Sequence, residues 1–297
     1  MSGSCSSWLD EPWRYAPRLA RAPGSVARIL AAMAPRRVPV ALSIAGSDSG
    51  GGAGIQADVK AFARAGVHGA TAITAITVQN TVAVSAVAAV APEIIVAQIR
   101  AVAEDLGVDA VKIGMLGDVA TIEAVAGALD ALPAGTPVVH DPVMLAESGA
   151  RLLAADAVDA LRSLIVPRAT VITPNLAEAR VLAGDETLDG LELARALHAL
   201  GPSCVVITGG HRAAAVDLFF DGVQLTELPG ERHPDGAAHG SGCTHSSTLA
   251  ARLALGDEPL AAARHARAVA AAAVADGLRD LGAGPGPVDV FGLARRR

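Results

Sequence analysis

The sequence has 297 residues, a formal net charge of −6, 52% hydrophobic residues and only 2% aromatic residues. This apolar fraction is sufficient for a large buried core and excludes a chain that is disordered throughout. The acidic charge and the few aromatic rings argue against a nucleic-acid groove, and no apolar run reaches the roughly 18 residues of a membrane span. The cysteines, Cys5, Cys204 and Cys243, form neither a disulfide framework nor a metal-ligand motif, which favours the cytoplasm.

Residues 1–37 differ in composition from the rest of the chain. They contain both tryptophans and the only tyrosine, but no apolar segment of the kind that a secretory signal requires. We interpret them as a disordered N-terminal extension of a single domain that covers residues 38–297. An alternative is that translation begins at Met33, just before the first expected strand.

From residue 38 onward, short apolar runs alternate with segments of helical periodicity. A strand at 38–45 ends in a glycine-rich turn at 46–54, and a helix follows at 55–65. The further expected strands are 71–78, 110–113, 137–140, 171–173, 204–208 and a hairpin of 216–220 with 223–228. The further expected helices are 92–106, 119–129, 155–165, 175–182, 188–200, 241–255 and 259–278. This alternation predicts an α/β fold with a central, mostly parallel sheet flanked by helices on both faces.

Ligands bind at the carboxyl ends of the strands in such sheets, so the residues after each strand are the candidates for a site. Residues 52–57, Gly-Ala-Gly-Ile-Gln-Ala, match the dinucleotide-binding pattern and open the possibility of a nicotinamide-dependent oxidoreductase. That pattern also requires an acidic residue about 20 positions further on, but no Asp or Glu occurs between Asp58 and Glu93. The dinucleotide interpretation is therefore weak. A loop whose backbone approaches another ligand, with Asp58 one helical turn later, is favoured instead.

The segment His239-Gly240-Ser241-Gly242-Cys243-Thr244 precedes a helical, alanine-rich run. Unpaired N–H groups at a helix start bind anions, and small residues at 240–242 would let a phosphoryl group approach them. The same field would lower the pKa of Cys243 and favour its thiolate. We therefore expect Cys243 to act as a general base towards a substrate hydroxyl; a structural, buried cysteine is the alternative.

Acidic residues also follow the strands at 137–140 and 171–173. Asp141 comes directly after the first of these, and Asn175 and Glu178 lie three residues apart after the second. Hard oxygen ligands at such positions suit Mg²⁺, which also bridges to phosphates. Asn175 could instead cap a helix with Glu178 as its partner, and both roles are compatible. Together with an anion site at 240–243, these residues indicate phosphoryl transfer.

The motifs resemble those of the hydroxymethylpyrimidine/phosphomethylpyrimidine kinases of thiamine biosynthesis, in the ribokinase-like superfamily. The resemblance covers about residues 38–292. Its motifs occur in order at 45–58, 78–81, 112–116, 141–144, 173–178, 209–211, 240–244 and 284–288.

This resemblance implies a ribokinase-like fold and a kinase that uses ATP and Mg²⁺. The implied substrate is 4-amino-5-hydroxymethyl-2-methylpyrimidine and then its monophosphate. The resemblance also implies a homodimer. The resemblance implies that Cys243 is the general base and that Gly240, Ser241 and Gly242 form the anion hole. It implies a pyrimidine site made by Gln79, Asp58, Gly46, Met115 and Val143. It also implies an ATP site made by Asn175, Thr208 and Gly210, and a metal site made by Asp141 and Glu178.

Two positions depart from the family pattern. Ser241 stands where the family often has Thr, and Thr208 stands where it usually has Lys, which removes a possible phosphate contact. Two alternatives stay open: a pyridoxal or pyridoxine kinase with the same chemistry, and a binding or regulatory protein that kept the pocket. The acidic residues and Cys243 argue against the second.

Overall fold

Eight strands form the main sheet in the part of the chain that the computed structural model describes, residues 38–209, 215–234 and 236–296. Their spatial order is β10-β9-β8-β7-β6-β5-β1-β2. Each pair of neighbouring strands from β2 to β8 is parallel. Strand β9 pairs antiparallel with both β8 and β10. The strands are β1 (Val40–Ala45), β2 (His68–Ile73), β5 (Ala110–Ile113), β6 (Val138–His140), β7 (Val171–Ile172), β8 (Cys204–Ile207), β9 (Val216–Phe220) and β10 (Leu225–Pro229).

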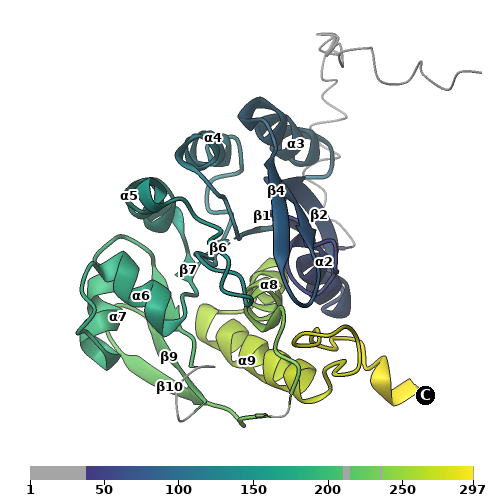
Figure 1. The fold of residues 1–297 in the computed structure, drawn as a ribbon. Coiled ribbons are helices and arrows are strands. Elements are labelled where there is room, and N and C mark those ends of the chain that lie inside the picture. Colours follow the sequence, from purple (N-terminus) through teal and green to yellow (C-terminus); the bar gives the residue numbers. More distant parts are fainter. Residues whose placement is uncertain (1–37, 210–214, 235, 297) are drawn as a thin grey trace, which may run out of the picture. The chain divides into compact units, whose positions relative to one another are not determined.

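Helices cover both faces of this sheet, so the predicted fold is confirmed (Figure 1). One face carries α3 (Pro92–Asp105), α4 (Val119–Leu129), α5 (Val158–Ala160), α6 (Leu176–Ala183) and α7 (Gly190–His198). The other carries α2 (Gly54–Arg64), α8 (Ser241–Ala254) and α9 (Pro259–Ala275).

The alternation of side chains along β1 separates the two cores. Leu42 and Ile44 point into the cluster that includes Ile95 and Ile99 of α3, whereas Ala41 belongs to the cluster with Phe62 of α2 and Leu249 of α8. Both faces of the sheet are therefore buried, which explains the continuously apolar strands.

The single strand predicted at 71–78 is wrong. The chain bends at Thr74, whose N–H donates to Ala45 O at 3.0 Å and whose hydroxyl donates to Met115 O at 2.7 Å. After the bend, β3 (Ala75–Gln79) leaves the main sheet and pairs with β4 (Val84–Ala89), a strand that was not predicted. Tertiary hydrogen bonds, rather than local propensity, divide this apolar run.

The helix predicted at 155–165 is irregular. It consists of a 3₁₀ turn (Ala155–Ala157), the short α5, a π turn (Leu161–Ile165) and a 3₁₀ turn (Val166–Arg168) that contains Pro167. Because Pro167 has no N–H to donate and its ring crowds the preceding turn, an α-helix cannot continue regularly through it.

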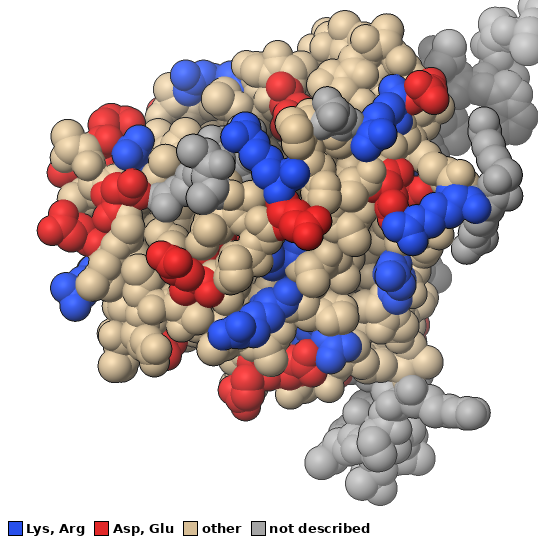
Figure 2. Space-filling view, turned by 90° about the horizontal axis from the view of Figure 1, so that it is seen from below, with Lys and Arg blue, Asp and Glu red and all other residues tan. Residues whose placement is uncertain are grey.

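The surface view in Figure 2 shows one face of the molecule. Acidic and basic side chains are mixed on this face, and uncharged atoms cover most of the area between them. No continuous basic stripe is visible among the described residues on this side. Within the described ranges, none of the helices combines the length and apolar character needed to cross a bilayer.

Candidate active site

The sheet changes direction of winding between β1 and β5, which is where α/β folds bind ligands. β1 leads through α2 to β2 on one side and pairs with β5 on the other. Beyond the strands the ladder continues: Asp141 N–H donates to Ile113 O at 2.8 Å, and Thr173 N–H donates to His140 O at 2.9 Å. The segments that follow β5, β6 and β7, and with them several predicted site residues, therefore lie side by side.

Helix α8 begins at this edge with several unpaired N–H groups. Gly240 has a left-handed φ of 85°, and a Cβ there would lie 1.8 Å from the carbonyl oxygen of Gly52. The N–H of Ser241 donates to a preceding carbonyl, whereas those of Gly240, Gly242 and Cys243 have no hydrogen-bond partner within the described ranges. Such a helix start can bind an anion through its backbone.

Cys243 is half-buried, and the prediction of a lowered pKa for its thiol is wrong. Burial raises the pKa of this thiol to about 12, and the charges of Asp58 and Asp141 act in the same direction. Lys112 and the backbone N–H of Gly54 lower the pKa but do not compensate. At neutral pH Cys243 is therefore a thiol, because desolvation outweighs the charge of Lys112 and the Gly54 N–H.

Asp58 lies in a buried ion pair that the sequence analysis missed. Its carboxylate is 3.0 Å from Nζ of Lys112 and accepts hydrogen bonds of 2.6 Å from the hydroxyls of Ser43 and Ser247. Lys112 and Asp58 are both 0% exposed. The substrate-binding role predicted for Asp58 would require one of these donors to give way.

The sequence contains a feature that could have indicated the pairing of Lys112. A single lysine inside the apolar strand Ala110–Ile113 must either be paired or lose its charge. In the structure burial alone would lower the pKa of Lys112, but the charge and hydrogen bond of Asp58, with the charge of Asp141, outweigh burial and raise the pKa. Lys112 is therefore a buried cation paired with Asp58.

Asp141 and Glu178, the predicted metal ligands, are two buried carboxyl groups, 6% and 9% exposed. Burial raises the pKa of both, that of Glu178 to about 8 with the charge of Asp141 as a further cause. Ser246 donates to Asp141 at 2.9 Å, and the backbone N–H groups of Asn175 and Met144 donate to Glu178 at 3.0 and 3.3 Å.

The chemistry of this pair fits a magnesium ion. No cluster of three or more His, Cys, Asp or Glu side chains suited to a metal occurs in the part of the chain that the structure describes. Mg²⁺ usually takes one or two carboxylates and completes its shell with water and substrate phosphates. A cation beside Asp141 and Glu178 would also offset the cost of their buried charge.

Asn175 and Thr208 lie next to each other in a parallel bridge between the ends of β7 and β8. The capping role of Asn175 is confirmed, because its side chain accepts from Glu178 N–H while Glu178 accepts from its backbone N–H. Thr208 N–H donates to Pro174 O at 2.9 Å. The ATP-binding roles of Asn175 and Thr208 stay predictions, and that of Gly210 lies outside the described residues.

The residues predicted to bind the pyrimidine come from three segments. Gly46 is close to Met115, since a Cβ on Gly46 would lie 3.0 Å from Sδ of Met115. The backbone of Gln79 is held by Ser49, whose hydroxyl accepts from Gln79 N–H at 2.8 Å and donates to Gln79 O at 2.6 Å. The side-chain amide of Gln79 has no hydrogen-bond partner in the described ranges and is available for a ligand. Val143 is half-buried, two residues beyond Asp141.

One pocket of about 310 Å³ opens beside this region. It is lined by Met115, by Val87 and Ala89 of β4, and by a segment that includes Arg151 and Leu153. Met115 is the only predicted site residue among its lining residues. The pocket therefore adjoins the predicted site on the side of the β3–β4 hairpin and does not coincide with it.

Comparison with known proteins identifies the family of the chain. Residues 48–289 match the model of the family described as phosphomethylpyrimidine kinase. The chain belongs to the phosphomethylpyrimidine kinase family. A hydroxymethylpyrimidine/phosphomethylpyrimidine kinase of Rhizobium meliloti is 49% identical over 263 residues, which cover 85% of this chain and 97% of the relative. The predicted family is thus confirmed, and this kinase is a phosphotransferase.

The solved structures that resemble this chain include a phosphomethylpyrimidine kinase and a pyridoxal kinase. The phosphomethylpyrimidine kinase of Clostridium difficile matches with a TM-score of 0.69 and 37% identity, over 77% of this chain and 96% of that one. The pyridoxal kinase of Bacillus subtilis, solved as an ADP complex, matches with a TM-score of 0.78 and 39% identity, over 86% and 99%. These two kinases are named after different substrates, a phosphomethylpyrimidine and pyridoxal.

Proposed function

We propose that this kinase transfers the γ-phosphoryl group of ATP to the hydroxymethyl group of 4-amino-5-hydroxymethyl-2-methylpyrimidine, and then phosphorylates the resulting monophosphate. The observation that carries the proposal is the start of α8, where a thiol and unpaired N–H groups meet a carboxylate. A Cβ on Gly242 would lie 4.0 Å from Oδ2 of Asp141. The name of the R. meliloti relative supports this substrate.

The backbone of α8 would stabilise the transferred group. The N–H groups of Gly240, Gly242 and Cys243 can donate to the phosphoryl oxygens, on which negative charge is spread in the transition state. Because these donors are fixed by the helix, they require no reorganisation during the reaction. Mg²⁺ held by Asp141 and Glu178 would bridge to the phosphates of ATP and neutralise charge there.

Cys243 would accept the proton of the substrate hydroxyl. A thiol with a raised pKa can do so only after it has lost its own proton. Lys112 and the Gly54 N–H favour the thiolate, while the charges of Asp141 and Asp58 oppose it. Neutralisation of Asp141 on substrate binding would therefore move Cys243 towards the thiolate.

Gln79 would recognise the substrate ring. An aminopyrimidine presents a donor and acceptors in one plane, which a side-chain amide can meet with both of its groups. The Ser49 hydroxyl fixes the backbone of Gln79, and this limits the orientations of the amide. A site built for these hydrogen bonds rejects rings that lack the matching groups.

Pyridoxal is the second candidate substrate, because the B. subtilis structure with the higher TM-score is a pyridoxal kinase. One assay separates the two: ATP consumption with the hydroxymethylpyrimidine, its monophosphate and pyridoxal side by side. We expect the highest kcat/KM with the first two. A kcat/KM for pyridoxal above that for the pyrimidine would reverse the assignment, and no turnover with any of the three would overturn the proposed function.

We also propose a cytoplasmic homodimer. Both cysteines in the described ranges are free thiols, as a reducing compartment requires. The β3–β4 hairpin exposes Ile76 and Val78 on one of its faces, 56% and 59%, and Val82 at its turn, 56%. Clustered apolar side chains of this kind are typical of protein interfaces. Sedimentation velocity measures the mass in solution, and a monomer at micromolar concentration would contradict the dimer.

A further inference from the structure

Two helices begin at the same place in this kinase. Helix α2 starts at Gly54 and α8 at Ser241, and the two helices pack against each other. The contact at their starts is tight: Gly240 approaches the carbonyl of Gly52, and the Gly54 N–H is near enough to Cys243 to lower its thiol pKa. The geometry around the thiol thus depends on how the glycine-rich loop 46–54 is held.

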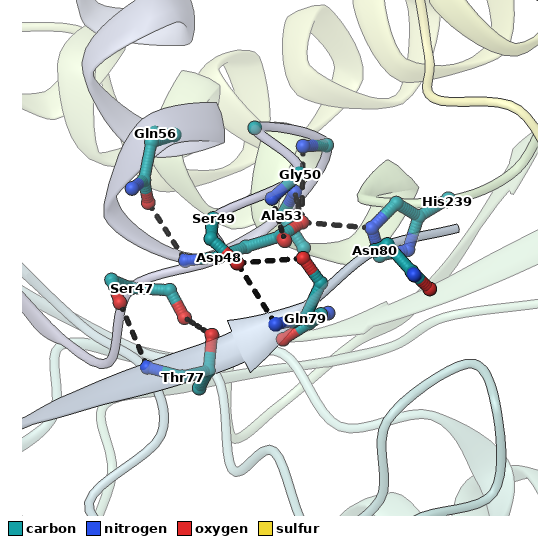
Figure 3. A network of polar contacts seen from close by, with 12 residues as sticks. Ser47, Asp48, Ser49, Gly50, Ala53, Gln56, Thr77, Gln79, Asn80 and His239 are labelled. Atoms are coloured by element: carbon teal, nitrogen blue, oxygen red, sulfur yellow. Dashed lines mark hydrogen bonds and ion pairs between the residues drawn. The ribbon is translucent and has the colours of Figure 1, made fainter. Parts of the chain in front are cut away.

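Asp48 organises this loop from within (Figure 3). Its Oδ1 accepts from Gly50 N–H at 2.8 Å, and its Oδ2 accepts from Gly52 and Ala53 N–H at 3.0 and 2.8 Å. The side chain is 1% exposed. Although burial alone would raise the pKa of Asp48, these donors and His239 lower it. The carboxylate is therefore ionised and holds three backbone N–H groups of the loop.

His239 joins the loop to α8. Its Nε2 lies 2.8 Å from Oδ2 of Asp48, and both side chains are buried. Because the carboxylate can only accept, Nε2 carries the hydrogen and donates it. His239 directly precedes Gly240, and its own backbone is held by Gly286 and Val288, at 3.3 and 3.1 Å. The imidazole has little freedom to leave the carboxylate.

The same loop reaches the predicted pyrimidine site. Ser47 accepts from Thr77 N–H at 3.1 Å, and Ser49 bridges the N–H and carbonyl of Gln79 (Figure 3). Within the described residues, neither Ser47 nor Ser49 forms a hydrogen bond with His239. The attachment of the loop to β3 through serines is therefore separate from its attachment to α8 through Asp48.

We propose that Asp48 and His239 are positioning residues that hold the start of α2 against the start of α8, so that the Gly54 N–H and the Gly240–Cys243 turn keep a fixed arrangement around the thiol. The proposal rests on the proposed phosphoryl transfer for its kinetic consequence, but not for its structural one. Neither side chain needs to touch a substrate. A displacement of about 1 Å in such an arrangement can cost on the order of 100-fold in rate.

The test compares His239→Leu with His239→Gln. Leucine fills part of the volume but donates nothing, whereas the amide nitrogen of glutamine can replace Nε2 as donor. We expect His239→Leu to lower kcat by about 10- to 100-fold with little change in the KM of either substrate, and His239→Gln to restore kcat to within about threefold of the parent. His265→Leu is the matched control, since His265 is exposed on α9 and should leave kcat unchanged.

Hydrogen exchange tests the structural part without any assay of activity. In His239→Leu the amides of residues 50–56 and 240–244 should exchange faster, by about tenfold or more, while those of α9 keep the parent rate. Unchanged exchange in both segments would refute the proposal, even if the protein phosphorylates none of the tested substrates. A glutamine variant as slow as the leucine variant, or a loss confined to KM, would equally refute it.

Discussion

Replacing Lys112 by methionine removes the cation of the buried pair but keeps most of the side-chain volume. The carboxylate of Asp58 would then stay buried, 0% exposed, with the hydroxyls of Ser43 and Ser247 as its remaining donors. Loss of one partner from a buried ion pair typically costs about 3–5 kcal/mol, because the other charge is left uncompensated. The two serine hydroxyls place the expected loss at the lower end, about 3 kcal/mol.

Thermal unfolding measures this loss. For a domain of this size about 1 kcal/mol shifts Tm by roughly 2–4 °C, so Lys112→Met should lower Tm by about 6–12 °C. The matched control is Lys60→Met, because Lys60 is the only other lysine of the chain and is exposed. An exposed substitution should change stability by about 0.5 kcal/mol or less.

A double-mutant cycle separates the pair from its surroundings. Asp58→Asn alone leaves Lys112 without its anion, whereas Lys112→Met with Asp58→Asn removes both charges. The double variant should therefore be more stable than the sum of the two single effects predicts, by about 1–3 kcal/mol. Additive losses, or a Tm of Lys112→Met within 2 °C of the Lys60→Met control, would refute the assignment of a stabilising pair.

Three further predictions concern the chemistry of the site. Cys243→Ala should lower kcat by about 100-fold or more, as expected for a lost general base; near-normal turnover would remove Cys243 from the reaction. Gln79→Leu should raise the KM for the pyrimidine while the Kd for ATP in calorimetry stays unchanged; equal losses of both would indicate misfolding. Because Glu178 has a raised pKa in the folded protein, its contribution to stability is full below pH 4.5 and is lost as the pH rises through about 8. Without added metal or nucleotide the Tm should therefore fall between about pH 4.5 and pH 8, Glu178→Gln should remove most of this fall, and an identical fall in that variant would contradict the assignment.

The sequence was sufficient to predict the parts of the fold that depend on local pattern. The helix predicted at 55–65 corresponds to α2, and the strand predicted at 38–45 contains β1, because helical periodicity and bounding glycines are both local signals. The β3–β4 hairpin was missed, since alanine and valine in this stretch do not distinguish a buried strand from an exposed one. The bend at Thr74 comes from partners elsewhere in the chain, which local pattern cannot identify.

In the candidate site, too, the features that follow from local pattern were predicted and those that depend on distant residues were not. The positions of Asp141, Glu178 and Cys243 at the carboxyl edge followed from the order of strands and helices. The pairs Lys112–Asp58 and His239–Asp48 did not, because their members are 54 and 191 residues apart in sequence. The pKa of Cys243 was predicted from the helix start alone, and the burial that reverses its direction depends on the packing of α2 and the sheet.

These buried charges explain why a neutral thiol is compatible with a basic role. Within the ligand-free site Lys112 is matched by Asp58, so the charge of Asp141 acts on Cys243 and Glu178 without a cation of its own at hydrogen-bond distance in the described ranges. Burial and this charge keep protons on both groups. A cation bound at Asp141 and Glu178 would offset the charge of Asp141 and so lower the pKa of both groups, while the contribution of burial, the largest cause, would remain. Cation binding would thus move Cys243 towards the thiolate, the form that a general base requires.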